Sequence, residues 1–287
     1  MVKKYSELYL DARKALLPVD GEFAPNMARE LLSAASGKTQ EAIIADRELY
    51  ASEEISARLE DYVARHIAGE PLAYILGKWE FFGMTLTVNR DVLIPRDDTV
   101  AVTELAIKRA LFLPQNPRVL DLCTGSGCIG LAIAHKVKDA RVTLGDVSQA
   151  ALRVAKKNVA DQQLHGRVTC LAVDATKPAA PFLGKFDLIV ANPPYVTSEE
   201  MRSLDDSVKN YEPHLALDGG PDGLALYRAI LENFTAALNP GGIVCFEHGL
   251  GQEDAVAALL REHGYTVLET KRDNSYIIRA VAAQYQP

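Results

Sequence analysis

Apolar residues recur three and four positions apart in the first 75 residues, which is the spacing of one face of an α-helix. Glycine and proline interrupt this pattern at Pro18–Gly21, Gly37 and 69–71, where turns are expected. The segments with helical spacing are 5–17, 26–35, 39–45 and 55–68. This part of the chain is therefore expected to form a bundle of four or five short helices.

The pattern changes after Gly77, where apolar and polar residues alternate as they do in strands. Residues 79–82, 84–88 and 92–94 are strand-like, and a helix is expected over 99–111. We expect residues 77–97 to form a β-hairpin linker. It would join a helical domain (1–76), interpreted as a substrate-recognition domain, to a larger domain (98–287).

Short apolar runs alternate with helical spacing from residue 118 to residue 283. The expected strands are 118–123, 141–147, 167–174, 186–191 and 242–249, followed by 266–273 and 275–283. The expected helices are 129–137, 150–160, 224–238 and 253–262. Such alternation predicts a mostly parallel sheet covered on both faces, and the last two strands are close enough to pair antiparallel. The predicted class is α/β and Rossmann-like, with an antiparallel closing strand and a small N-terminal helical domain.

Composition narrows the classes of function. The chain has 287 residues, 24% of them charged, and a net charge of −7 without a run of Lys or Arg. This balance disfavours broad binding to a nucleic-acid backbone. The absence of an apolar run near 18 residues and of a signal peptide predicts a cytoplasmic protein with no membrane association. The four cysteines lack CxxC spacing, so we expect reduced thiols and no metal site, although Cys123 and Cys128 flank a glycine loop.

The run FDLIVANPPY (186–195) ends a predicted buried strand in a stiff segment. Two prolines fix two φ angles and make Asn192–Tyr195 an extended lip. The Asn192 side-chain oxygen and the Pro193 carbonyl form two acceptors that match the hydrogens of a planar NH2 group. Pro194 adds rigidity, and Tyr195 offers an aromatic face. A simple Pro-Pro turn is the structural alternative.

A glycine loop, Asp121–Gly130, follows the first strand of the larger domain and contains G-x-G-x-x-G before a helix. Such a loop allows a ligand to approach the backbone and the helix amino terminus. Asp121 would repel a pyrophosphate but would favour a cationic or hydroxyl-rich ligand. Asp146 ends the second strand, where a carboxylate can accept from ribose hydroxyls, and Asp174 ends the third. Helix capping is the alternative for these acids.

These features are compatible with three different classes of protein, which differ in what else they predict. A DNA or RNA amino-methyltransferase would use the same lip but predicts a basic groove. An NAD-dependent oxidoreductase would use the glycine loop and leaves Asp121 and the lip unexplained. A non-enzymatic binding module predicts that no methyl group is transferred.

The loop and lip resemble the site of class I methyltransferases. The stretches GEPLAYILGKWEFFG, DVLIPR and YEPHLALDGGPDGL further resemble the peptide chain release factor glutamine N5-methyltransferases, over about 28–281. A methylase of a ribosomal-protein glutamine is the nearest alternative. The family often has glycine in place of Cys123 and an aromatic residue in place of Ala175.

The resemblance implies methyl transfer from S-adenosylmethionine, yielding S-adenosylhomocysteine, to the glutamine of the Gly-Gly-Gln loop of class 1 release factors. It also implies that the helical domain contacts the release factor, and a monomer without direct nucleic-acid binding is expected. The implied cofactor residues are Asp121, Cys123, Thr124, Gly125, Ser126, Gly127, Asp146, Asp174, Ala175 and Asn192. The implied substrate-binding residues are Asn192, Pro193, Pro194 and Tyr195, of which Asn192, Pro193 and Tyr195 would be catalytic.

Overall fold

A computed structural model describes residues 2–286, and the chain divides after Gly77 into two compact units. The helices of the first unit are α1 (Tyr5–Asp20), α2 (Ala24–Ser36), α3 (Gln40–Ala45), α4 (Glu53–Ile67) and α5 (Leu72–Leu76). Its core consists of buried side chains such as Leu8 and Leu16 of α1 and Leu31 of α2. Apolar spacing of three and four residues thus places one face of each long helix in a common core.

Two features of the first unit differ from the prediction. The turn expected at Pro18–Gly21 begins later, because α1 continues through Pro18 to Asp20. A proline so close to the end of a helix removes a single hydrogen bond, and the backbone N–H of Gly21 still bonds to Leu17 O. The four segments predicted with helical spacing also do not include α5, which ends where Gly77 adopts a left-handed φ of 69°.

The second unit begins with the predicted hairpin of β1 (Lys78–Phe81) and β2 (Met84–Thr87). Phe82 and Gly83 both have positive φ, 51° and 77°, as a two-residue hairpin turn requires. The strand predicted over 92–94 is wrong: a turn at 90–91 leads into a bend at residue 92, and residues 93–94 form no regular secondary structure. The Ile94 N–H donates to the Glu212 side chain, 3.1 Å away, instead of to a neighbouring strand.

A seven-stranded sheet forms the centre of the second unit. Its strands are β3 (Arg118–Leu122), β4 (Arg141–Asp146), β5 (Val168–Ala172), β6 (Phe186–Ala191), β7 (Leu238–Glu247), β8 (Tyr265–Arg272) and β9 (Ile278–Tyr285). Their order is β5-β4-β3-β6-β7-β9-β8. All pairs are parallel except those of β9, which lies antiparallel between β7 and β8. The predicted mostly parallel sheet with an antiparallel closing strand is confirmed.

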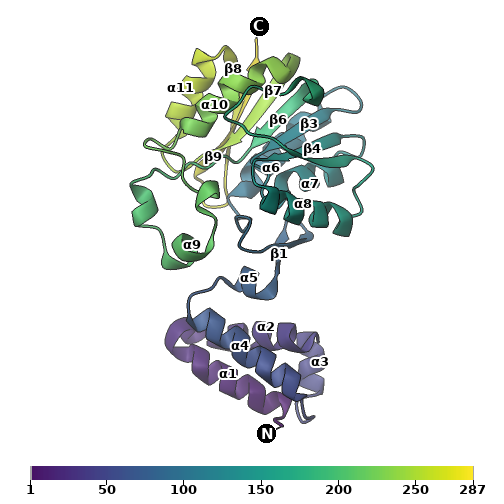
Figure 1. Cartoon of the computed structure of the whole chain (residues 1–287), viewed down its shortest axis with the longest axis vertical. Coiled ribbons are helices and arrows are strands. Elements are labelled where there is room, and N and C mark those ends of the chain that lie inside the picture. The colour runs from purple at the N-terminus through teal and green to yellow at the C-terminus, as the bar shows by residue number, and fades with distance from the viewer. Residues whose placement is uncertain (1, 287) are drawn as a thin grey trace. The chain divides into compact units, whose positions relative to one another are not determined.

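Helices cover both faces of this sheet (Figure 1). They are α6 (Thr99–Leu111), α7 (Cys128–Lys136), α8 (Gln149–Asp161), α10 (Ala225–Phe234) and α11 (Glu253–Glu262), while the short α9 (Asp206–Tyr211) lies in the segment between β6 and α10. The helix expected over 224–238 is shorter than predicted, because a 3-10 turn follows Phe234 and β7 begins at Leu238.

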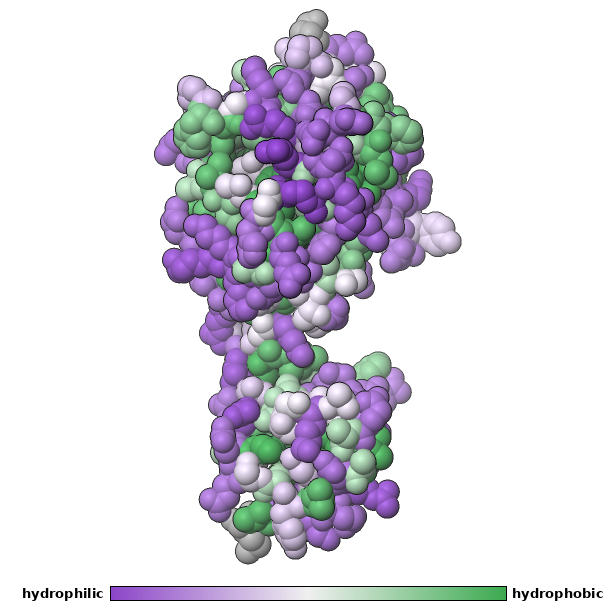
Figure 2. Space-filling model, turned by 90° about the vertical axis from the view of Figure 1, so that its right-hand side faces the viewer, coloured by the Kyte–Doolittle hydropathy of each residue, from purple (hydrophilic) through white to green (hydrophobic). Residues whose placement is uncertain are grey.

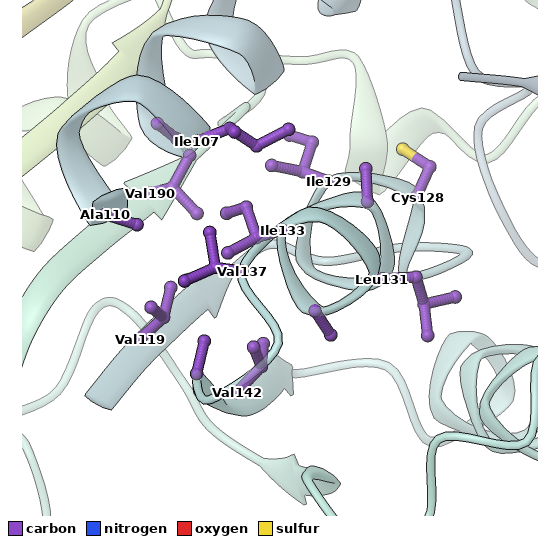
Figure 3. Packing of buried hydrophobic residues seen from close by; sticks show 14 of the residues in the cluster. Ile107, Ala110, Val119, Cys128, Ile129, Leu131, Ile133, Val137, Val142 and Val190 are labelled. Atoms are coloured by element: carbon purple, nitrogen blue, oxygen red, sulfur yellow. The ribbon is translucent and has the colours of Figure 1, made fainter. Parts of the chain in front are cut away.

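Alternate residues of the central strands, such as Leu188 and Ile189 of β6, enter two separate cores. One core joins α6, α7 and α8, and Figure 3 shows Ile129 and Ile133 of α7 directed toward Ile107 and Val190. The other joins α10 and α11 to the opposite strand faces. Polar residues cover most of the larger unit on the side seen in Figure 2. Within the described residues, no helix combines the length and apolar character needed to cross a bilayer.

Candidate active site

The sheet order reverses between β3 and β6, because β3 leads to β4 on one side and β6 leads to β7 on the other. Ligands of open α/β sheets bind at the carboxyl ends of the strands beside such a point. A cavity of ≈ 270 Å³ lies there. The expected site residues that line it are Cys123, Thr124, Gly125, Ser126, Asp146, Asp174, Ala175, Asn192 and Pro194. Four others do not line it, namely Asp121, Gly127, Pro193 and Tyr195.

The glycine loop between β3 and α7 owes its shape to three left-handed residues. Cys123, Gly125 and Gly127 have φ of 57°, 54° and 86°. A backbone hydrogen bond from Gly127 N to Thr124 O at 2.8 Å closes the turn, and one from Thr124 N to Gly145 O at 3.1 Å joins it to β4. Left-handed geometry costs a non-glycine residue about 1–2 kcal/mol, so Cys123 is a strained position in the cavity wall.

Asp121 lies beneath this loop rather than at the cavity. Its side chain is 1% exposed, and its Oδ2 accepts hydrogen bonds from Thr124 Oγ1 at 2.6 Å and Gly130 N at 2.9 Å. Burial raises the pKa of Asp121 to about 7, although these two hydrogen bonds oppose the rise. Asp121 therefore joins the loop to the first turn of α7 and shapes the site without facing it.

Gly130 is required by close packing against the sheet. A Cβ at this position would lie 2.3 Å from Leu144 Cδ2 and 3.0 Å from Asp121 Oδ2. Asn158 of α8, which sequence analysis missed, supports the other side of the loop. Its fully buried amide donates to Ser126 O at 2.9 Å and to Thr87 O at 3.0 Å.

Asp146 ends β4 and faces the cavity with both oxygens engaged by backbone. Its Oδ2 accepts from Gly125 N and its Oδ1 from Ser148 N, each at 2.9 Å. Ser148, not Asp146, caps α8, because its hydroxyl accepts from Ala151 N at 3.1 Å. Burial raises the pKa of Asp146, opposed by the backbone hydrogen bonds. Each carboxylate oxygen retains a lone pair for a hydroxyl of a ligand.

Asp174 and Ala175 form the neighbouring wall, beyond the end of β5 at Ala172. Asp174 Oδ1 accepts from Thr176 N at 2.9 Å and Thr176 Oγ1 at 2.6 Å. These hydrogen bonds lower the pKa of Asp174. The strand thus ends two residues earlier than predicted, but both residues still line the cavity.

The lip directly follows β6, and Asn192 reaches the cavity from it. The Asn192 Nδ2 group donates to Thr99 Oγ1, the first side chain of α6, at 3.4 Å. Tyr195 does not line the cavity; its carbonyl accepts from Gln252 Nε2 at 3.0 Å, and burial raises the pKa of its phenol. The expected aromatic wall from Tyr195 is absent from the described cavity lining.

A glycine-rich segment supports the back of the lip. A Cβ on Gly219 would lie 2.7 Å from Pro194 O, and one on Gly223 would lie 2.4 Å from Tyr195 O. Gly219 N donates to Val196 O at 2.8 Å. Only glycine allows the two backbones to approach this closely.

Glu212 joins this same segment to the residues before α6. Its side chain is 1% exposed and accepts hydrogen bonds from Ile94 N and from the Arg96 guanidinium. Pro213 and Leu215, just beyond it, line the cavity together with Pro95. The sequence contained both segments as motifs, but only the structure brings them together.

Glu247 and His248 at the end of β7 are an alternative acid–base pair by sequence position. Neither lines the described cavity, and their exposed fractions are 1% and 0%. Burial lowers the pKa of His248, whose Nδ1 lies 3.1 Å from Gly249 O. The two side chains are therefore not placed to exchange protons with a bound substrate.

Comparisons with known proteins agree with this arrangement. Residues 7–77 match the model of the PrmC N-terminal domain, and residues 103–220 match that of the methyltransferase small domain. A release factor glutamine methyltransferase from Clostridium acetobutylicum is 36% identical over 280 residues, covering 98% of each chain. One from Bordetella pertussis is 43% identical over 219 residues, covering 75% of this chain and 78% of its own. A methyltransferase from Pyrococcus furiosus shares the fold, with a TM-score of 0.52 and 18% identity over 80% of this chain and 98% of that chain.

Proposed function

The chain belongs to the release factor glutamine methyltransferase family, and from this premise we propose that it methylates the side-chain amide nitrogen of a glutamine in class 1 peptide chain release factors. S-adenosylmethionine is the proposed methyl donor. The single observation that carries the proposal is the position of Asn192, which lines the same cavity as Asp146 and the glycine loop. An amide-binding group and a nucleoside-binding group thus face one space.

The cavity fits a nucleoside ligand by the chemistry of its walls. Asp146 is the group for ribose hydroxyls, because its carboxylate lines the cavity and is held in place by two backbone N–H groups. Val173 and Ala175 supply apolar surface for a base. The acidic side chains at the wall, Asp146 and Asp174, favour a ligand that carries positive charge.

The bound cofactor supplies an electrophilic methyl group; the protein supplies orientation. A glutamine amide nitrogen is a poor nucleophile because its lone pair is delocalised into the carbonyl. We propose that Asn192 Oδ1 and the Pro193 carbonyl each accept one amide hydrogen and direct the nitrogen toward the methyl group. Alignment of this kind supplies most of the expected rate enhancement. The alkylated nitrogen then loses a proton to water, so no general base is required.

We further propose that residues 1–76 bind the body of the release factor. This proposal is supported by the match of residues 7–77 to the PrmC N-terminal domain and by the compact core of the unit. Because release factors act on the ribosome, we propose that the reaction takes place in the cytoplasm.

The test is methyl transfer from labelled S-adenosylmethionine to purified release factor, with the glutamine-to-alanine substrate as the negative control. Wild-type protein should label only the glutamine-containing factor. Asn192→Ala should abolish turnover while the cofactor Kd stays within about tenfold, or 1.4 kcal/mol. Asn274→Ala, at an exposed turn, is the matched control and should behave like wild type. Label on DNA or on ribosomal protein alone, or full turnover by Asn192→Ala, would refute the proposal.

A further inference from the structure

Glu247 is a buried acid directly behind the lip. It is the last residue of β7, and its predecessor Phe246 pairs with Ala191, the last residue of β6. Glu247 therefore lies beside Asn192 at the carboxyl ends of two parallel strands. Its side chain is 1% exposed, and Oε2 has no hydrogen-bond partner among the described residues. A carboxyl group placed this way is costly to bury, which calls for a reason other than stability.

The surrounding charges do not supply that reason. The guanidinium of Arg279 bonds to Asp98 and to Asp273, each at 3.0 Å, so these donors are directed to those acids. Burial raises the pKa of Glu247 to about 8 and the charge of Asp98 adds to the rise, whereas the Thr99 and Asn192 side chains and the charge of Arg279 oppose it. Glu247 thus interacts with Thr99 and with Asn192 of the lip, and the opposing charges of Asp98 and Arg279 leave its pKa raised.

Thr99 completes a short chain of polar groups. Thr99 is 2% exposed, and its hydroxyl accepts from Asn192 Nδ2, which leaves the hydroxyl proton available for an acceptor such as Glu247. The nitrogen end of the Asn192 amide is therefore directed inward, toward Thr99 and Glu247. Its oxygen, on the opposite side of the Cβ–Cγ axis, is left for the cavity, which Asn192 lines.

We propose that Glu247, together with Thr99, is a positioning residue that holds the Asn192 amide with its oxygen toward the substrate. The inference rests on the proposed function, because it assigns the orientation needed to accept the hydrogens of a glutamine NH2. A flipped amide would turn Oδ1 toward Thr99 and Glu247 and lose the bond from Nδ2 to Thr99 Oγ1. It would also present two donors to the substrate NH2, which offers only donors. The acceptor oxygen of Glu247, together with Thr99, thereby favours the productive orientation without touching the substrate.

Glu247→Met and Glu247→Gln distinguish a role in orienting the Asn192 amide from a role in the stability of the fold. Methionine removes the acceptor at similar volume, and kcat should fall about 10- to 100-fold, the range for a displaced catalytic group. Glutamine keeps one oxygen acceptor and should restore kcat to within about threefold of wild type, since a hydrogen bond between neutral groups remains. The melting temperature of Glu247→Met should not fall, because removing the desolvation cost of a buried acid offsets the loss of its hydrogen bonds.

The measurements are kcat and KM for the release factor, Kd for S-adenosylhomocysteine and thermal unfolding, with the exposed Glu262→Gln as control. Thr99→Val combined with Glu247→Met should lose no more than Glu247→Met alone, because both act through one amide. Wild-type kcat in Glu247→Met, equal losses in the Met and Gln variants, or a loss matched by weaker cofactor binding would each overturn the positioning role. A wild-type protein that fails to label the release factor would instead refute the proposed function.

Discussion

Replacing Asp121 by asparagine tests how burial of an acid beneath the glycine loop affects stability. Asparagine has the same shape, and its Oδ1 can still accept from Thr124 Oγ1 and Gly130 N, the two bonds made by Asp121 Oδ2. Its nitrogen would take the position of Oδ1, which has no hydrogen-bond partner among the described residues. The substitution therefore removes the titration and keeps the hydrogen bonds.

The magnitude follows from the pKa of Asp121, which burial raises from 3.8 to about 7. Because the folded protein holds this proton more tightly than the unfolded chain, the stabilisation is complete below about pH 4 and is lost as the pH rises through 7. The difference between the pKa of 3.8 in the unfolded chain and about 7 in the folded protein corresponds to about 4 kcal/mol, at about 1.4 kcal/mol for each pKa unit. The free energy of unfolding of wild type minus that of Asp121→Asn should fall by about this amount between pH 4 and pH 8.

Urea unfolding of the cofactor-free proteins at several pH values measures this difference, and taking a difference cancels the other groups that titrate. Asp121→Ala is the matched variant: it also lacks the titration but leaves Gly130 N and Thr124 Oγ1 without their acceptor. The free energy of unfolding of Asp121→Ala should be about 1–3 kcal/mol lower than that of Asp121→Asn at every pH. A wild-type minus Asp121→Asn difference that varies by less than about 1 kcal/mol over this range would show that the carboxyl is ionised in the folded protein.

Two further substitutions test the packing around the site. Gly130→Ala should destabilise the protein by about 1–3 kcal/mol and weaken cofactor binding, because its Cβ would lie 2.3 Å from Leu144 Cδ2 in the core. Calorimetry and binding titration measure the two effects, and Gly166→Ala, whose Cβ would meet open space, is the control. Glu212→Gln should lower the free energy of unfolding by about 1–3 kcal/mol, because the buried carboxylate that pairs with Arg96 is lost. It should also speed backbone amide hydrogen exchange in residues 197–222. Unchanged exchange there would contradict a role for this pair in holding the cavity wall.

Local physical chemistry was enough to locate most elements from the sequence. Apolar runs between turn residues predicted β6 at 186–191 with its observed bounds, and helical spacing did the same for α6 at 99–111 and α11 at 253–262. The glycine loop and the lip were also evident, because glycine and proline restrict or release backbone angles wherever they occur. These features depend on residues within a few positions of one another.

Other features needed the tertiary structure because they depend on residues far apart in the chain. Residues 92–94 have strand-like composition but form no strand, since Ile94 bonds to a side chain 118 positions away. Asp121 belongs to the predicted loop, yet its carboxyl group turns beneath it because Gly130 and Thr124 offer donors there.

The orientation of the Asn192 amide is the clearest case. The sequence placed this residue at the end of a strand, but the direction of its oxygen depends on Thr99 and Glu247, from α6 and β7. No local pattern connects these three residues, and only the parallel pairing of β6 and β7, with α6 packed against them, brings their side chains together. The sequence alone thus determined which groups are available for chemistry, whereas the packing of distant elements decided which of their atoms face the cavity.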